Sequence, residues 1–158
     1  MKRGTALIMI VVMSAGCSKA KESNDFASMQ ARGEHVMGVN QFTSAHIFED
    51  LSDGGRVVLD RDDPSDSAGI ATVRAHMRDI AAAFRAGDFA KPFEVHAQTV
   101  PGTGVMTARR DKISYEVNDR PRGGEVRIRS DDPQAIAAIH EFLAFQRNAH
   151  RAAGHEVR

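Results

Sequence analysis

Hydrophobic and polar residues alternate in two short stretches of the chain. In the first stretch, Val57 and Leu59 occupy one side of the pattern, and in the second Val126 and Ile128 do so, with polar or charged residues between them. A period of two is typical of a β-strand that buries one face and exposes the other. The pattern therefore predicts two half-buried strands.

Each of these strands follows a Gly-Gly pair, at Gly54-Gly55 and at Gly123-Gly124. Glycine reaches positive φ without steric penalty, so each pair favours a tight hairpin turn. The surrounding sequence is itself repeated: residues 37–64 recur without a gap as residues 106–133, an offset of 69 (106 − 37). The repeat predicts two equivalent hairpins, the first with strands near 41–51 and 56–61.

Apolar residues at helical spacing follow each hairpin. The first run (Ile70, Val73, Met77, Ile80, Phe84) predicts a helix from about Ser67 to Ala86, and the second (Ile136, Ile139, Leu143) predicts one from about Pro133 to His150. We expect an α+β fold, a tandem ββα-ββα repeat in which two helices pack on one face of an antiparallel sheet. A single domain would span residues 35–150, with halves at about 36–87 and 105–150.

Two parts of this scheme lie outside the simple repeat. In the connector, residues 88–105, Phe93, Val95 and Ala97 alternate with polar residues and suggest a short extra strand. The second helix carries a further apolar stripe that includes Phe142 and Phe145, and such a stripe is either covered or used as an interface. The connector and a second protomer are both candidate covers, and the second would make the protein a homodimer.

The first residues predict export. A basic start, a short apolar run and small residues precede Cys17, the only cysteine of the chain. This arrangement resembles the bacterial lipoprotein signal, in which the signal peptide (here residues 1–16) is removed and the cysteine is acylated. An ordinary secretory signal with an unrelated cysteine is the alternative. The residue after the cysteine, Ser18, is not the aspartate that this class associates with inner-membrane retention.

The resemblance therefore implies a lipid anchor at Cys17 in the cell envelope, with the domain attached to the outer membrane and facing the periplasm. Residues 17–34 are polar and lack periodicity, which predicts a flexible tether. Residues 151–158 are expected to form a frayed tail.

The charge balance adds a constraint on partners. The chain has 21 basic and 21 acidic residues, and removal of residues 1–16 would take away two bases and no acid. A slightly acidic protein lacks the basic footprint that nucleic acid requires, so no nucleic-acid partner is expected.

The sequence contains no catalytic motif of a common class: no nucleophile elbow, phosphate loop, zincin helix or dinucleotide fingerprint. With its one cysteine assigned to the lipid, the chain also lacks a free thiol for catalysis. We therefore expect a protein that is not an enzyme.

The chemistry that remains concerns histidine and methionine. The chain has seven of each, and the strand pattern turns His46 toward the helices, while His76 borders the first buried stripe. Imidazole and thioether ligands suit copper, whereas imidazole alone also suits zinc or haem iron. The candidate ligands are His46, His76 and His96, with Met37 or Met106 as a soft axial partner.

Other interpretations of these residues remain open. The histidines could simply form hydrogen bonds at the core edge while the methionines fill the core. Semi-buried histidines also titrate near neutral pH, which allows pH sensing. The leading function is thus an envelope lipoprotein that binds copper or a small ligand. The alternatives are a structural or protein-interaction lipoprotein and, least favoured, a small hydrolase.

The region from Met37 to His150 resembles a family of small exported bacterial proteins of unknown function. The matching features are the Gly-Gly hairpins, Arg74-Ala75-His76, Gly87-Asp88-Phe89, His96 with Pro101-Gly102, and the run Ile139-His140-Glu141-Phe142-Leu143. Members are sometimes labelled aspartate carbamoyltransferase. The Ser-Thr-Arg-Thr motif that binds carbamoyl phosphate in that enzyme is missing here, so the resemblance implies domain limits and no activity.

Overall fold

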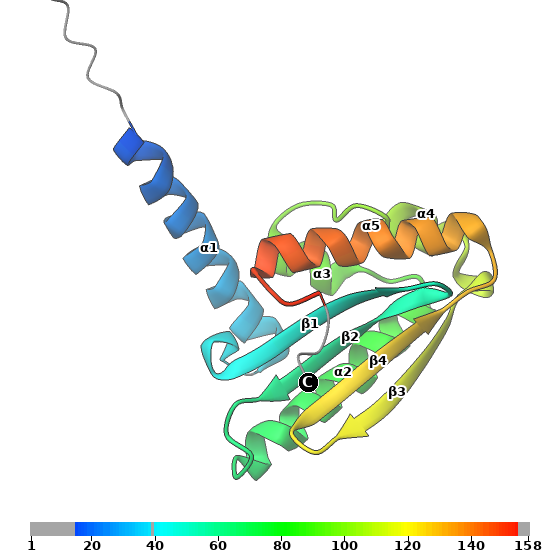
Figure 1. The fold of residues 1–158 in the computed structure, drawn as a ribbon, viewed down its shortest axis with the longest axis horizontal. Coiled ribbons are helices and arrows are strands. Elements are labelled where there is room, and N and C mark those ends of the chain that lie inside the picture. Colours follow the sequence, from blue (N-terminus) through cyan, green and yellow to red (C-terminus); the bar gives the residue numbers. More distant parts are fainter. Residues whose placement is uncertain (1–14, 39, 155–158) are drawn as a thin grey trace, which may run out of the picture.

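The protein is an α+β structure built on one four-stranded antiparallel sheet (Figure 1). The computed structural model describes residues 15–38 and 40–154. The strands are β1 (Ser44–Leu51), β2 (Gly54–Arg61), β3 (Ser114–Arg120) and β4 (Gly123–Arg129), in the order β1-β2-β4-β3. The helices are α1 (Ala15–Met37), α2 (Ser67–Arg85), α3 (Ala90–His96), α4 (Thr103–Ala108) and α5 (Pro133–His150), with 3-10 turns η1 (Gln41–Thr43) and η2 (Arg110–Lys112). The α+β class and the antiparallel sheet are as expected from the sequence.

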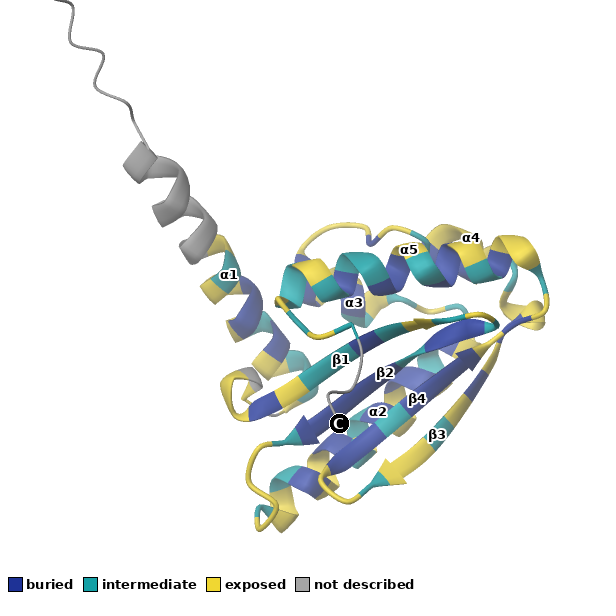
Figure 2. Ribbon diagram, viewed as in Figure 1, coloured by how far each residue is buried: buried dark blue, intermediate teal, exposed yellow. Residues whose placement is uncertain are grey.

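Helices α2 and α5 pack against the same face of this sheet. Residues that pair directly across two strands share a face of the sheet. Gly55 pairs with Ile128, and Gly124 pairs with Leu59, so both glycines lie on the face that carries these core residues. A Cβ atom on Gly55 would meet the side chain of Leu143 in α5, and one on Gly124 would meet Met77 in α2. The core thus forms between one sheet face and two helices, where Figure 2 shows continuous burial along β2 and β4.

Local capping explains where these helices begin and end. Asp66 accepts a hydrogen bond from the Gly69 amide at 2.9 Å, and Asp132 accepts from Gln134 and Ala135 at 2.8 and 3.1 Å. Gly87, just beyond α2, has φ 79°, the left-handed conformation that glycine adopts without strain. The expected bounds of α5, Pro133 to His150, are confirmed.

The sheet register is symmetric about its centre. Val57 pairs with Val126, its counterpart in the repeat, while Gly54 pairs with Arg129 and Asp60 with Gly123. The turns η1 and η2 also stand 69 positions apart (110 − 41). The repeated residues therefore occupy corresponding places on either side of the β2–β4 pair.

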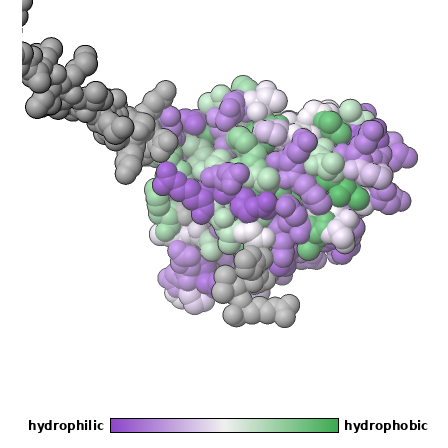
Figure 3. Space-filling model, turned by 45° about the horizontal axis from the view of Figure 1, so that its top comes forward, coloured by the Kyte–Doolittle hydropathy of each residue, from purple (hydrophilic) through white to green (hydrophobic). Residues whose placement is uncertain are grey.

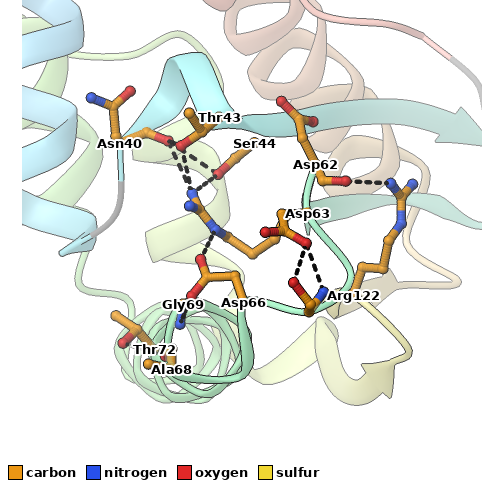
Figure 4. A network of polar contacts seen from close by, with 12 residues as sticks. Asn40, Thr43, Ser44, Asp62, Asp63, Asp66, Ala68, Gly69, Thr72 and Arg122 are labelled. Carbon is orange, nitrogen blue, oxygen red and sulfur yellow. Dashed lines mark hydrogen bonds and ion pairs between the residues drawn. The ribbon is translucent and has the colours of Figure 1, made fainter.

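Arg61, at the end of β2, links the corner where β1 begins and α2 starts (Figure 4). Its Nε donates to Asp66 at 2.9 Å, and its Nη1 donates to the hydroxyls of Ser44 and Thr43 at 2.7 and 2.9 Å. The guanidinium satisfies several acceptors at once because its five donors form a rigid fork. This corner fixes the first residue of β1, two positions before His46.

The segment before β1 differs from the sequence expectation. Where a flexible tether was predicted for residues 17–34, the chain forms α1, which runs from the body in Figure 1. Its last part packs against α3: Met29 is 6% exposed, and the Arg32 Nε donates to the Val95 carbonyl at 2.8 Å. The sequence shows no apolar periodicity here, because few of the side chains between residues 25 and 37 are buried.

Three further expectations need correction. The connector residues that alternate form the helix α3, not a strand, and residues 41–43 form a 3-10 turn rather than the start of β1. Within the described residues the tail beyond α5 lies beside β1, where the Ala153 carbonyl accepts from the Phe48 amide at 3.0 Å. The alternating pattern wrongly predicted a strand in the connector, because a segment as short as the seven residues of α3 fits both the period of a strand and that of a helix.

Two features of the predicted export signal can be placed only in part. Residues 1–14 lie outside the described residues, and Cys17 falls near the start of α1. No helix in the described ranges is long and apolar enough to cross a membrane.

Candidate functional site

His46 points from β1 toward the helices, as the strand pattern predicts. It pairs with Leu59 across the β1–β2 ladder, and its ring lines a cavity beneath α2, α3 and α5. Its repeat counterpart, Tyr115, takes the same inward position in β3 and is 4% exposed. The Nε2 atom of His46 is buried and has no hydrogen-bond partner. A buried polar atom without a partner is unfavourable and marks a place where a ligand could bind.

Four histidines from four different elements line this one cavity, which has a volume of about 80 Å³. They are His46 from β1, His76 from α2, His96 at the end of α3 and His150 at the end of α5. Met37, the last residue of α1, also lines the cavity. The remaining wall is mostly apolar and includes Phe48, Val57, Leu59, Ile80, Phe84 and Phe142.

Three of the four histidine rings lie close together, with His150 between His46 and His96. The ring centroid of His150 is 5.3 Å from that of His46 and 5.1 Å from that of His96. Phe48 packs beside the pair, 5.6 Å from His150 and 6.0 Å from His46. The helix end at His150 and the strand β1 are held in this arrangement by Arg147, which donates to the Phe48 carbonyl at 2.5 Å.

Burial keeps these imidazoles neutral at pH 7. Desolvation lowers the pKa of His46 to about 4, with a smaller contribution from His76. It also lowers the pKa of His76 to about 4, where Lys91 adds to the effect and Asp79 opposes it. The pKa of His150 falls to about 3 because of burial and then its neighbours His46 and His96. A neutral imidazole keeps one nitrogen lone pair, so each ring can accept a proton, a hydrogen bond or a metal.

The tautomer of His96 is set by Gln146 on α5. The Oε1 atom of Gln146 lies 2.8 Å from His96 Nε2, and both side chains are buried. Because an amide oxygen only accepts, Nε2 carries the proton and Nδ1 keeps the lone pair. Burial lowers the pKa of His96, although this hydrogen bond opposes the shift.

The structure thus brings together His46, His76, His96 and Met37 from the predicted ligand set, but it does not bring Met106 to them. Met106 is completely buried in the hydrophobic core and is not among the residues that line the cavity. Met106 is the counterpart of Met37 in the repeat, but Met106 lies in α4, which packs against α5, whereas Met37 ends α1, which packs against α3.

The arrangement is not a preformed polydentate metal site. Within residues 15–38 and 40–154, no group of three or more His, Cys, Asp or Glu side chains is positioned to hold a metal ion. Any metal would therefore rely on fewer than three of these residues, together with a thioether such as that of Met37.

Sequence reasoning missed His150 and Gln146. The signal was available, because Leu143, Gln146 and His150 follow at helical spacing and so share the buried face of α5. His140, by contrast, has a structural role. Its Nε2 lies 3.0 and 2.8 Å from the carbonyl oxygens of Leu51 and Gly54, so it donates to the β1–β2 turn.

The connector covers the second apolar stripe of α5, one of the two covers considered. Phe142 is 2% exposed and packs edge-on against Phe84 and Phe89. Phe145 meets the His96 ring edge-on, with centroids 4.9 Å apart. Of the two phenylalanines expected as interaction residues, Phe142 is thus an internal contact, whereas Phe145 is half-buried.

A second, outer groove lies between α1, α3 and the end of α5. It is lined by polar residues of α1 and α5, and His96 belongs to its wall as well as to that of the cavity. Arg151, over the ring of Phe26 at 4.1 Å, connects the end of α5 to α1 across this groove. His96 therefore belongs to the walls of both the mostly apolar histidine cavity and the outer groove.

Comparison of this chain with protein-family models, with curated proteins and with solved structures finds no match.

Proposed function

We propose that this protein is a non-enzymatic binding module of the cell envelope, and that the cavity lined by the four histidines takes a small soft ligand, with copper as the leading candidate. The observation that supports this most directly is the convergence of His46, His76, His96 and His150 on one cavity. The ring of His96 is buried and the other three are half-buried, and holding imidazoles away from water is unfavourable unless their polar atoms gain partners. The unpaired Nε2 of His46 gives one specific position for such a partner.

The size and character of the cavity limit the ligand. A volume of about 80 Å³ is smaller than the engineered cavity of about 150 Å³ that holds benzene in another protein. Haem, considered from the sequence, is many times larger. The cavity suits a single ion or a molecule of a few heavy atoms that accepts contact with neutral imidazoles.

The proposal predicts stoichiometric uptake that depends on the inward histidines. We expect the purified Cys17→Ser protein to bind one equivalent of Cu(I), Cu(II), Zn(II) or the neutral probe imidazole. The double change His46→Ala with His76→Ala should abolish that uptake, because it removes two of the four rings. Titration followed by calorimetry and by amide NMR measures both binding and its location.

A matched control is His35→Ala, since His35 is exposed on α1 and lies outside the cavity. It should bind like the parent protein. Absence of uptake of all four probes at micromolar concentration, or equal uptake by the double variant, would contradict the proposed function.

The alternative function, a structural or interaction module, has less support from the surface the sequence suggested. The connector covers part of that stripe, since Phe142 is buried and Phe145 is half-buried against His96. On the face drawn in Figure 3, green apolar residues are interspersed with purple hydrophilic ones rather than gathered into one broad patch. The cavity is therefore the stronger basis for a function.

We also propose that the chain is lipid-anchored at Cys17, with the domain in the periplasm at the outer membrane. Support comes from the basic, apolar and small residues that precede Cys17. Expressed in a two-membrane bacterium, the full chain should partition with membranes and incorporate labelled palmitate. The Cys17→Ser variant should lose the label, and continued labelling of that variant would rule out acylation at this residue.

We infer further that the two halves descend from one duplicated ββα unit. The repeated sequence and the register centred on Val57 and Val126 support this origin. In that case the halves diverged at this position, where His46 lines the cavity and its counterpart Tyr115 lies within the core.

A further inference from the structure

We infer that the cavity is selective for a monovalent soft cation, Cu(I), and that His150 is its central ligand with His46 and Met37. This inference rests on the proposed function and specifies its ligand. It adds a residue absent from the sequence-based set, an oxidation state and a low coordination number.

The spacing of the rings supports a shared ion. Two imidazoles on one ion, with metal–nitrogen bonds of about 2.0 Å at tetrahedral angles, have ring centroids about 5 Å apart. The centroids of His46 and His150 are 5.3 Å apart. The two rings therefore already stand at the separation a shared ion needs. Because they are nearly parallel, at 18°, binding one ion requires them to turn until both ring planes contain it.

The donor set favours a soft ion with few ligands. Met37 and Met77 both supply thioethers to the cavity wall, and Met37 is the one that is only half-buried, since Met77 is 1% exposed and packed in the core. Thioethers bind Cu(I) far better than they bind hard ions. Two imidazoles and one thioether satisfy Cu(I), which is stable with two or three ligands. Zinc in proteins almost always takes four, and the described residues offer no group of three nitrogen, thiolate or carboxylate ligands.

Charge selects further against divalent ions. Among the described residues the cavity wall contains no carboxylate, and its one charged member is Lys91, whose amine is 2.7 Å from Asp79. The desolvation penalty of an ion rises with the square of its charge, so a divalent ion in this apolar wall would lose about four times as much as a monovalent one.

The decisive experiment is a chelator competition on the Cys17→Ser protein. Under anaerobic, reducing conditions, bathocuproine disulfonate competes for Cu(I), and parallel titrations use Zn(II) and, without reductant, Cu(II). We expect one Cu(I) per chain, bound at least about 100-fold more tightly than Zn(II).

Three variants test the ligands. In His150→Phe an aromatic ring remains beside Phe48 and His46 but offers no lone pair, so Cu(I) affinity should fall at least about 100-fold, given that loss of an outer partner alone typically costs 10- to 100-fold. Met37→Leu keeps the volume without sulfur and should lower affinity about 10-fold. His35→Ala should have no effect. Circular dichroism confirms that each variant is folded.

The possible outcomes separate this inference from the proposed function. Zn(II) bound as tightly as Cu(I), or parental Cu(I) affinity in folded His150→Phe, would overturn the Cu(I) site while leaving a ligand-binding cavity in place. Cavity-dependent binding of imidazole alone would do the same. Failure of every probe would remove both.

Discussion

Acidification from pH 7 to pH 5 is expected to destabilise the protein by several kcal/mol. Burial lowers the pKa values of His46 and His76 to about 4 and that of His150 to about 3, whereas unfolded histidine titrates near 6.5. Below pH 6.5 the unfolded chain therefore binds protons that the folded chain excludes, so the free energy of unfolding falls with pH.

The size of this effect follows from the same linkage. Between its unfolded-state pKa and its folded-state pKa, each ring lowers the free energy of unfolding by about 1.4 kcal/mol per pH unit. At pH 5 the loss is therefore about 2 kcal/mol per ring. Three rings together contribute about 6 kcal/mol, comparable to the net stability of an ordinary domain. The stabilisation is complete above pH 6.5 and is lost as pH falls toward 4 and then 3. Urea unfolding at pH 7, 6 and 5 measures it.

The charged groups around the cluster do not reverse this expectation. Lys91 lowers the pKa of His76 and Arg32 lowers that of His96, while Asp79 opposes the shift at His76. Asp79 itself and the capping carboxylates of Asp66 and Asp132 have lowered pKa values, so they titrate below the histidine window. His150→Phe should reduce the slope between pH 6.5 and 5 by about one proton. An unchanged slope in that variant, or stability independent of pH in the parent, would contradict the assignment.

Gly123→Ala is expected to destabilise the protein by about 3 kcal/mol or more. A Cβ atom at Gly123 would lie 2.0 Å from the carbonyl oxygen of Leu59, within the central β2–β4 pair. Backbone atoms cannot move aside as a flexible side chain can, so the two strands would have to separate. Thermal and urea unfolding of the variant measure the loss.

Gly54→Ala, at the equivalent position of the repeat, tests the same contact, and Gly104→Ala serves as the control. Gly54, the counterpart of Gly123, would place its Cβ 2.4 Å from the carbonyl oxygen of Ile128 and has φ 133°, so Gly54→Ala should destabilise to a similar or greater extent. Gly104 in α4 has no atom within 4 Å of its added Cβ, and Gly104→Ala should stabilise slightly, by up to about 1 kcal/mol. A tolerated change at either strand glycine would count against the symmetric pairing and the inferred duplication.

The hairpins, both long helices and the inward direction of His46 could be predicted from the sequence because they depend on local rules. Period-two alternation identifies the inward residues of β2 and β4, although the structure also buries the opposite face, with Val58 at 0% and Arg127 at 9% exposure. The capping aspartate and proline fix the start of α5. Short or sparsely buried elements could not be predicted in this way. In α1 only a few side chains reach the body, and α3 is too short for its period to be read.

What the sequence by itself determined is the pair of ββα patterns and a set of histidines at their inner faces. What only the tertiary structure decided is which histidines meet. His46 and His150 are 104 residues apart (150 − 46) and become neighbours because α5 crosses β1, while Met106 is drawn into the core by α4. Spacing along a chain governs the faces of single elements, but the packing angle between elements sets which faces touch, and that angle depends on the whole core.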